Sequence, residues 1–293
     1  MQRLIVTGSR GLVGSALARV LGRPFDALHF AAADWRSSAE RADFRDATVI
    51  HLAARVHDPH ASQRSFHDDN VTKTRELARA AARGGARRFV YLSTAKVYGE
   101  ESGARPFGPA DALHPADPYA RSKAEAESAL REIARGTGLS IAVVRSPLVF
   151  APGAAANLAA LLRLADSPWP LPFAALRNRR SFVHADDLAR LLIDCASSAA
   201  ASAGTFLAAH AQPFSTSQLV CALRATLGRP ARLYPVPPRV LEVAASVLGA
   251  GTQMRRLTRS FELDASETTR LLGWEARVGL DAAVADLVRG YRP

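Results

Sequence analysis

The stretch RLIVTGSRGLVG, residues 3–14, decides the fold of this chain of 293 residues. Its apolar run, Arg3–Thr7, predicts a strand, and a helical pattern begins at Gly11. Gly8 permits a tight turn, Gly11 lets backbone N–H groups approach a pyrophosphate, and Gly14 lets the helix pack closely on the sheet. The positive end of the helix dipole faces the same place. The stretch therefore predicts a dinucleotide-binding strand–loop–helix unit.

Alternating strands and helices follow this unit. Apolar runs predict further strands at Ala27–Phe30, Thr48–Ala53, Arg88–Ser93 and Ser140–Arg145. Helical patterns lie between them, at about Asp69–Arg83 and Pro118–Arg135. Such alternation indicates an α/β fold with a doubly wound parallel sheet. The interval from Phe30 to Thr48 is short for a helix, a strand and a second helix, so we expect one strand or crossover fewer there.

The sequence changes character after Phe150. Regular secondary structure is expected to be interrupted at Ala151–Gly153 and in the proline-rich run Ser167–Pro172. Later patterns predict helices at Ala185–Ala199, Ser215–Leu227, Pro238–Leu248 and Leu280–Gly290, and short strands at Thr205–Ala208 and Leu233–Pro235. We expect a Rossmann domain over residues 1–165, to which 181–210 return. A smaller mixed domain for the substrate would comprise 166–180 and 211–293.

Composition narrows the class of protein. Hydrophobic residues make up 48% and charged residues 22%, which is ordinary for a globular chain. The net charge of +11 comes almost entirely from dispersed arginines, since lysine occurs only at positions 73, 96 and 123. This pattern suits a small anionic substrate, and we expect no nucleic-acid binding. The first apolar run is too short for a signal peptide, and no apolar run approaches the ~18 residues of a membrane span, so we expect a cytoplasmic protein without membrane insertion.

Neither the cysteines nor the histidines indicate a metal site. Cys195 and Cys221 form no disulfide framework and no ligand cluster, and both are expected to be reduced and buried. The histidine spacing fits no ligand set with a carboxylate or thiol partner. We therefore interpret four histidines as structural, namely His51, His57, His67 and His184.

Tyr119 and Lys123 lie four residues apart at the start of a predicted helix, so they project from one face. Asp117 is expected to cap this helix, with Pro118 at its first position. To act as a base, a tyrosine needs its pKa lowered by ~3 units, which a neighbouring lysine ammonium can provide. Thr94 ends an apolar strand, where catalytic residues of open parallel sheets gather, although a hydroxyl there can also be structural.

Together these segments resemble the extended short-chain dehydrogenases that act on nucleotide sugars, over nearly the whole chain. Other segments carry the resemblance too, namely His51–Ala54, Asn70, Arg145–Gly153 and Arg180–Ala189. It implies that Thr94, Tyr119 and Lys123 are catalytic, and that Asn157 and Arg180 hold a nucleotide diphosphate. The implied cofactor-binding residues are Gly8, Ser9, Arg10, Gly11, Leu12, Val13, Gly14, Asp34, Leu52, Ala53, Ala54, Asn70, Ser93, Tyr119, Lys123, Pro147 and Val149.

The cofactor is expected to be NAD or NADP. Asp34 lies 20 residues after Gly14, where an acidic residue binds the adenosine ribose of NAD, but the nearby Arg36 suits a 2′-phosphate instead. The family implies a homodimer built on the helices at Asn70–Arg83 and Pro118–Arg135.

Two segments, His51–His57 and Asn178–Ser181, resemble the 4-keto reductases of UDP-N-acetyl-6-deoxyhexoses, the quinovosamine and fucosamine group. They predict reduction of such a UDP-4-keto sugar at C4. The alternative is a UDP-hexose 4-epimerase, and a more remote one is an NAD(P)-sensing protein without turnover. The related 4,6-dehydratases carry Asp-Glu after the catalytic threonine, whereas this chain has Ala95 and Lys96. Since alanine transfers no proton, the dehydratase reaction is excluded.

Overall fold

The computed structural model describes residues 3–29, 35–56, 61–152 and 156–291, apart from the side chains of residues 156, 157 and 159. Within this part, parallel strands form one sheet in the order β2-β1-β3-β4-β5-β8. They are β1 (Leu4–Thr7), β2 (Asp26–Leu28), β3 (Thr48–His51), β4 (Arg88–Thr94), β5 (Ser140–Ser146) and β8 (Gly204–Leu207). The chain order reverses between β1 and β3. This confirms the predicted doubly wound α/β sheet.

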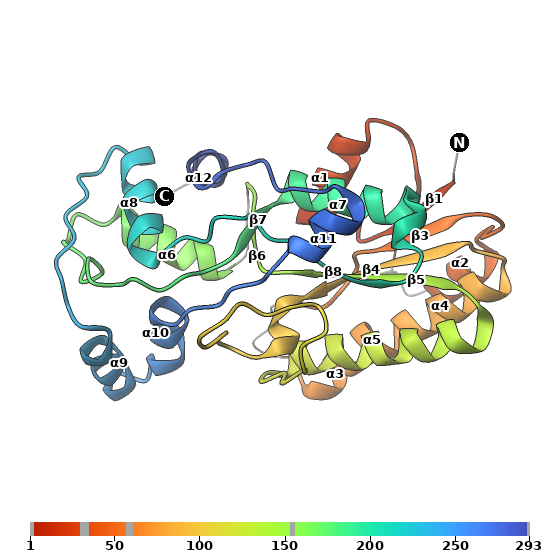
Figure 1. Cartoon of the computed structure of the whole chain (residues 1–293), viewed down its shortest axis with the longest axis horizontal. Helices are drawn as coiled ribbons and strands as arrows, with labels where there is room; N and C mark the ends of the chain where they lie inside the picture. The colour runs from red at the N-terminus through yellow and green to blue at the C-terminus, as the bar shows by residue number, and fades with distance from the viewer. Residues whose placement is uncertain (1–2, 30–34, 57–60, 153–155, 292–293) are drawn as a thin grey trace.

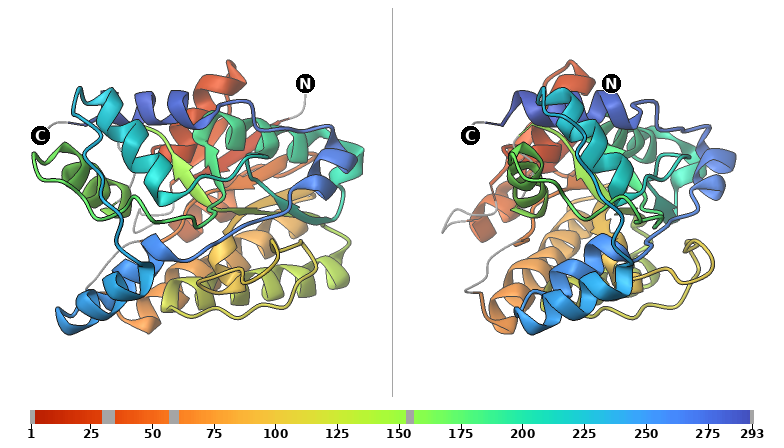
Figure 2. Two further views of the ribbon diagram at one scale, coloured as in Figure 1. Left: turned by 60° about the vertical axis from the view of Figure 1, so that its left-hand side comes forward. Right: turned by 90° about the vertical axis from the view of Figure 1, so that its left-hand side faces the viewer.

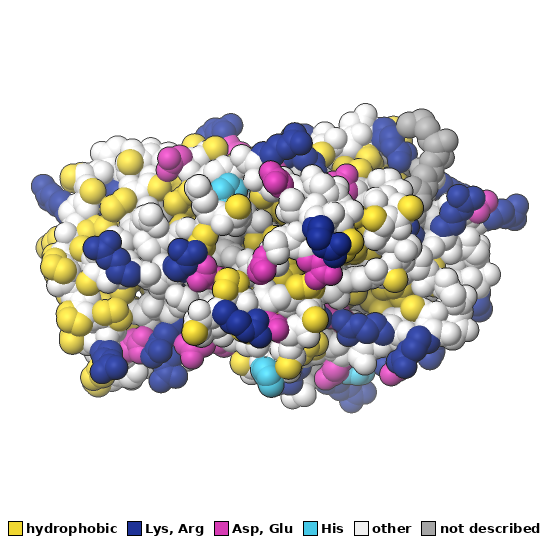
Figure 3. Space-filling view, viewed as in Figure 1, with side chains coloured by type: hydrophobic (Ala, Val, Ile, Leu, Met, Phe, Trp, Pro, Cys, Tyr) yellow, Lys and Arg dark blue, Asp and Glu magenta, His cyan; other side chains and the backbone are white. Residues whose placement is uncertain are grey.

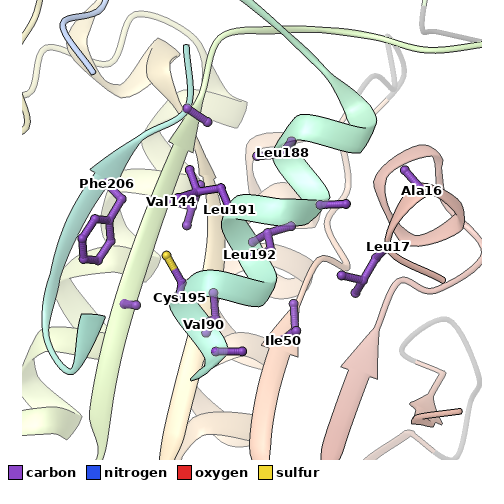
Figure 4. Packing of buried hydrophobic residues seen from close by; sticks show 14 of the residues in the cluster. Ala16, Leu17, Ile50, Val90, Val144, Leu188, Leu191, Leu192, Cys195 and Phe206 are labelled. Atoms are coloured by element: carbon purple, nitrogen blue, oxygen red, sulfur yellow. The ribbon is translucent and has the colours of Figure 1, made fainter. Parts of the chain in front are cut away.

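Helices cover both faces of the sheet (Figure 1). α1 (Leu12–Leu21) and α7 (Ala185–Ser197) pack on one face, and Figure 4 shows their leucines meeting Ile50, Val90 and Val144 of the strands. The other face carries α2 (Trp35–Arg41), α4 (Lys73–Arg83) and α5 (Pro118–Thr137). Because both faces are covered, β1 and β3 are buried along their whole length, which explains their continuous apolar sequences.

A second region lies beyond the carboxyl ends of the strands (Figures 1 and 2). It holds a small parallel sheet of β6 (Leu148–Phe150) and β7 (Phe182–His184). Its helices are α6 (Ala156–Asp166), α8 (Thr216–Thr226), α9 (Pro238–Val247), α10 (Gly251–Thr258) and α12 (Leu280–Arg289). α6, α8 and α12 share one apolar cluster with the two strands.

The chain returns from this second region to the sheet. α11 (Ser266–Leu272) lies beside β8, and the hydroxyl of Thr268 accepts the N–H of Leu207 at 2.9 Å. Trp274 packs in the same cluster as β1 and α7, and its indole donates to the carbonyl of Asp187 at 3.1 Å. The fully buried carboxylate of Asp187 accepts two further N–H groups, from Arg277 and Val278. A segment near the C-terminus is thus part of the core of the first region.

Several elements differ from the sequence-based expectation. The strand expected at Leu233–Pro235 is a single bridge between Leu171 and Leu233, because the prolines that follow lack the N–H groups of a ladder. The helix expected from Asp69 begins with a π-helical turn, Asp68–Thr72, preceded by the short α3 (Gln63–His67). The sequence analysis did not predict five further elements, namely β6, β7, α6, α10 and α11.

The expected shortening of the sheet is present. β2 is the edge strand beside β1, and α2 is the one helix or strand in the described part of the chain between β2 and β3. No helix among the described residues is both long and apolar enough to cross a membrane.

Candidate active site

A cavity of about 600 Å³ lies at the carboxyl ends of the strands, where the strand order reverses. Most of the predicted site residues line it, although they come from distant parts of the chain. They are Gly8, Gly11, Leu12, Val13, Gly14, Leu52, Ala53, Ala54, Ser93, Thr94, Tyr119, Lys123, Pro147, Val149 and Arg180. The sheet thus brings the glycine loop, the predicted trio and Arg180 to one cavity.

The glycine loop is closely packed. Gly8 has φ +71°, and a side chain there would meet the backbone nitrogen of Ala53 at 2.7 Å. A side chain on Gly14 would lie 2.3 Å from the carbonyl oxygen of Gly8, so Gly14 packs on the loop itself rather than on the sheet. Gly11 is the N-cap of α1, without a side-chain cap and without an acidic residue in the first turn. The first N–H groups of α1 are therefore suited to an anion.

Thr94 and Tyr119 meet across the cavity. Thr94 is the last residue of β4, and Tyr119 is the second residue of α5. As predicted, Asp117 caps α5 by accepting the N–H of Ala120 at 2.7 Å, with Pro118 at the first helical position. The side chains of Tyr119 and Thr94 are hydrogen-bonded to each other. A substrate oxygen beside them would meet both hydroxyl groups.

Lys123 does not lower the pKa of Tyr119 as the sequence led us to expect. Burial raises the pKa of Tyr119 well above its usual value, although the hydrogen bond with Thr94 opposes this effect. The Lys123 ammonium instead donates to the carbonyl of Leu92 at 2.6 Å and lies 4.1 Å from the centre of the Tyr91 ring. Burial lowers the pKa of Lys123 to about 7. In this pocket Tyr119 holds its proton firmly.

A buried ion pair supports β4 from behind. Glu127 of α5 accepts from Arg145 of β5 at 2.6 Å, and both side chains are almost fully buried. The same carboxylate accepts the hydroxyl of Ser93 at 2.6 Å, so this hydroxyl is directed toward Glu127. Arg145 also donates to the hydroxyl of Tyr98 and to the carbonyl of Pro109. These contacts hold β4, β5 and the segment after β4 together beside Thr94.

Arg180 lies in the opposite wall. Its backbone is held on two sides, since its N–H donates to the carbonyl of Phe214 and the next residue pairs with Phe261. The guanidinium donates to the carbonyl of Arg259 at 3.1 Å and lies 6.0 Å from the centre of the Phe261 ring. Burial lowers its pKa to about 10. Among the described residues no carboxylate forms an ion pair with Arg180, so its charge is available to an anion in the cavity.

Sequence reasoning missed part of this wall. Arg256 of α10 lines the cavity and pairs with Glu100 at 3.1 Å. Glu100 also lies 3.6 Å from Lys96, which is ion-paired with Asp117. No local motif distinguishes Arg256 from its neighbours, because it reaches the cavity only through the packing of α10. Other lining residues without a prediction are Val56, Leu92, Gly99, Ser146, Leu148, Leu158, Ser181 and Phe261.

Some predicted residues lie elsewhere. Ser9, Arg10 and Asn70 do not line the cavity, and Asp34 and the side chain of Asn157 lie outside the described residues. The amide of Asn70, on the π-helical turn, donates to the hydroxyl of Ser122 at 2.9 Å. Asn70 thereby joins the π-helical turn to α5 behind the cavity.

Arg36 and His51 also have partners away from the cavity. Arg36, the candidate for a 2′-phosphate, is paired with Glu76 at 2.8 Å. His51 is fully buried between the hydroxyl groups of Thr7 and Thr74, and burial lowers its pKa to about 3. His51 therefore stays neutral and links β1, β3 and α4.

Comparison with known proteins agrees with this geometry. Residues 4–206 match the model of the NAD dependent epimerase/dehydratase family. UDP-glucose 4-epimerase of Vibrio cholerae is 31% identical over 93% of this chain and 90% of its own length. dTDP-4-dehydrorhamnose reductase of Mycobacterium tuberculosis is 33% identical over 55% of each chain.

Solved structures share the fold. A UDP-glucose 4-epimerase from Thermotoga maritima, determined with UDP-glucose, superposes with a TM-score of 0.76 over 99% of this chain and 98% of its own, at 19% identity. The expected resemblance and cofactor class, NAD or NADP, are confirmed. The match over residues 4–206 and the Vibrio relative together show that this chain belongs to the NAD-dependent epimerase/dehydratase family of nucleotide-sugar enzymes.

Proposed function

We propose that this protein transfers a hydride between a nicotinamide cofactor and C4 of a UDP-sugar, and that it reduces a UDP-4-keto-6-deoxy-N-acetylhexosamine. The observation that carries the proposal is one cavity with two chemically different walls. Thr94, Tyr119 and Lys123 lie beside the glycine loop, and the unpaired guanidinium of Arg180 lies in the other wall. A sugar diphosphate matches this division, because its anionic end and its reacting carbon are separated.

Each member of the trio has a role in the reduction. The cofactor supplies the hydride. Tyr119 donates its proton to the oxygen at C4 as the carbonyl is reduced, and Thr94 hydrogen-bonds the same oxygen. Lys123, whose side chain donates to the carbonyl of Leu92, would hold the nicotinamide ribose. Positioning of the two reactants provides most of the acceleration.

Two features support reduction. Burial raises the pKa of Tyr119, so Tyr119 carries the proton that reduction at C4 consumes. Ala95 is buried, and Lys96 is ion-paired with Asp117, so neither position offers the acid that elimination of water needs. The Mycobacterium relative is itself named as a reductase.

Epimerisation at C4 is the second candidate function. The Vibrio relative, which matches most of this chain, is named UDP-glucose 4-epimerase. In that reaction an oxidised nicotinamide would take the hydride of C4 while Tyr119 takes the proton of the C4 hydroxyl group. The same groups would then return the hydride and the proton to the other face of the keto sugar. Such an enzyme must keep its cofactor between the two steps, whereas a reductase exchanges NAD(P)H in every cycle.

The first experiment tests the reaction and its direction. The purified protein is mixed with a UDP-4-keto-6-deoxy-N-acetylhexosamine and NADH or NADPH, and in parallel with UDP-glucose or UDP-N-acetylglucosamine. Oxidation of stoichiometric NAD(P)H supports the reductase. Interconversion of the UDP-hexoses without added cofactor, with NAD released on denaturation, supports the epimerase. No binding of either dinucleotide at millimolar concentration would overturn both.

The second experiment tests the trio. Tyr119→Phe removes the proton donor, so we expect the rate to fall by about 10³-fold while cofactor affinity is retained. Tyr234→Phe is the matched control, because Tyr234 is exposed and does not line the cavity. A sensor without turnover would bind the cofactor equally well and show no rate in either protein. Full activity of Tyr119→Phe would exclude the proposed acid.

A further inference from the structure

We propose that the end of the molecule formed by α9 and the loops before it docks on an anionic lipid surface. The exposed face of α9 is apolar: Val240, Val243 and Val247 are 55%, 66% and 83% exposed, and Leu248 after them is 82% exposed. These positions repeat at helical spacing, while Leu241 and Ala245 face inward. A stripe of this kind on a soluble protein marks an interaction surface.

Two aromatic side chains extend this stripe. Trp169 is 73% exposed and Tyr234 is 45% exposed. The segments that carry them run side by side, since Leu171 bridges to Leu233 and the N–H of Tyr234 donates to the carbonyl of Leu171. Figure 2, right, looks onto this end, with α8, the connection to α9, and α9 itself facing the viewer. Together these six exposed residues form the apolar end surface, namely Trp169, Tyr234, Val240, Val243, Val247 and Leu248.

A buried arginine fixes the two loops against each other. Arg224 of α8 is 1% exposed, and it donates to carbonyls of both loops, those of Ser167 and Trp169 and those of Pro230 and Arg232. Its partners are carbonyl oxygens, and no described carboxylate forms an ion pair with it. Arg224 thus holds the aromatic residues in place and adds a positive charge that no acid neutralises.

Basic side chains outnumber acidic ones at this end, and Arg232 and Arg239 are exposed there. Residues 215–241 contain no Asp or Glu, but they include Arg224, Arg229, Arg232 and Arg239. The nearby acids are engaged: Asp166 pairs with Arg229, and Glu242 pairs with Arg259. In Figure 3, hydrophobic side chains gather at this end with Lys and Arg side chains among them.

Lipid fits this combination better than a second copy of the chain. Two such ends brought together would set like charges against each other, which is unfavourable. At an anionic bilayer, the exposed Arg232 and Arg239 would meet headgroup phosphates. The aromatic rings would lie at the headgroup level, and the apolar face of α9 would enter the boundary with the acyl chains. The protein would then bind the membrane peripherally, with its cavity open to solution.

Vesicle co-sedimentation of the full chain tests the proposal. We expect binding to vesicles of phosphatidylglycerol and phosphatidylcholine, weaker binding as salt increases, and little binding to phosphatidylcholine alone. Val247→Glu should weaken binding about tenfold. Leu271→Glu is its control, because Leu271 is an exposed leucine outside this surface. Equal losses in the two variants would overturn the proposal.

A charge reversal provides the second test. Arg232→Glu with Arg239→Glu should weaken binding about thirtyfold, at about 1 kcal/mol for each arginine. Arg83→Glu with Arg135→Glu removes the same charge from α4 and α5 and should change binding little. Thermal unfolding and activity on the soluble substrate verify that all four proteins are folded. Equal binding to neutral and anionic vesicles would overturn the proposal. The proposal would also be overturned if the protein bound no vesicles and instead formed a dimer that the Val247→Glu substitution dissociates.

Discussion

The wall behind β4 buries Arg145, whereas the wall across the cavity leaves Arg180 partly exposed, and the two walls treat the charge of their arginine in opposite ways. Arg145 meets the buried carboxylate of Glu127, and its pKa is raised by that partner despite the burial. Arg180 has a carbonyl and an aromatic ring beside it, and burial lowers its pKa to about 10. The first arrangement is complete within the protein. The second leaves a charge that the proposed anionic ligand would neutralise.

The difference separates stability from binding. Removing a partner from a buried pair leaves a charge without compensation, which is strongly destabilising. Removing a partly desolvated charge that has no ion-pair partner removes its desolvation cost, so the free energy of unfolding should not fall. The affinity for an anionic ligand should fall instead. The two arginines should therefore respond differently to substitution.

The largest expected effect is on stability, and it concerns the buried ion pair of Glu127 and Arg145. Glu127→Gln leaves Arg145 buried without a countercharge, so we expect the free energy of unfolding to fall by about 3–5 kcal/mol, measured by urea denaturation. Glu132→Gln, an exposed glutamate on the same helix, should change it by less than about 0.5 kcal/mol. A loss below about 1 kcal/mol in Glu127→Gln would remove the distinction between the two walls.

The next effect concerns Arg180. Arg180→Met should weaken binding of UDP about 10- to 100-fold by calorimetry, because a charged hydrogen bond is worth about 1.5–3 kcal/mol. Its thermal stability should stay equal or rise. Arg179→Met is the control, since Arg179 pairs with Glu262 at the surface and does not line the cavity. Unchanged affinity together with lower stability would make Arg180 a structural residue like Arg145.

Lys123 is a second desolvated cation of the cavity, and it predicts a pH effect. Its pKa is about 7 in the folded protein against a usual 10.5, so between these values the unfolded chain binds the extra proton. Stability should therefore rise with pH above 7, by about 1.6 kcal/mol between pH 7 and pH 8.5. Well below pH 7 the lysine is charged in both states, and the desolvation cost of the buried charge is present in full. Lys123→Met should lack this rise in urea denaturation at several pH values. A parallel rise in both proteins would contradict the assignment.

The smallest effect concerns Glu100. Its charge acts on Arg180 and pairs with Arg256, so it competes with an anionic ligand. Glu100→Gln should tighten UDP binding about threefold at low salt and less at high salt, because the side chain is partly exposed. Glu101→Gln, more exposed and not part of the cavity lining, should have no effect. Weaker binding in Glu100→Gln would mean that Glu100 orients Arg256 rather than competing for it.

The sequence predicted the regions whose signals are local. The glycine loop, the capped start of α5 and the alternation of strands and helices each lie within a short stretch, so they were recognised. Arg256 was not, because tertiary packing alone brings α10 to the cavity. Glu100 was not recognised either, although it directly follows the recognised segment Thr94–Gly99. The sign of the pKa shift of Tyr119 was also wrong, since spacing reveals the distance to Lys123 but not the burial of both groups. The domain boundaries, the dimer and the roles of the site residues stay predictions.

The return of the chain near its C-terminus has an evolutionary consequence. Trp274 and Thr268 are joined to α7 and β8, so the region that lines the substrate side of the cavity is not a contiguous cassette. A recombination event that exchanged the last third of the gene with a relative would replace part of the core under the sheet as well. Chimeras designed for new specificity therefore need junctions on both sides of residues 266–278.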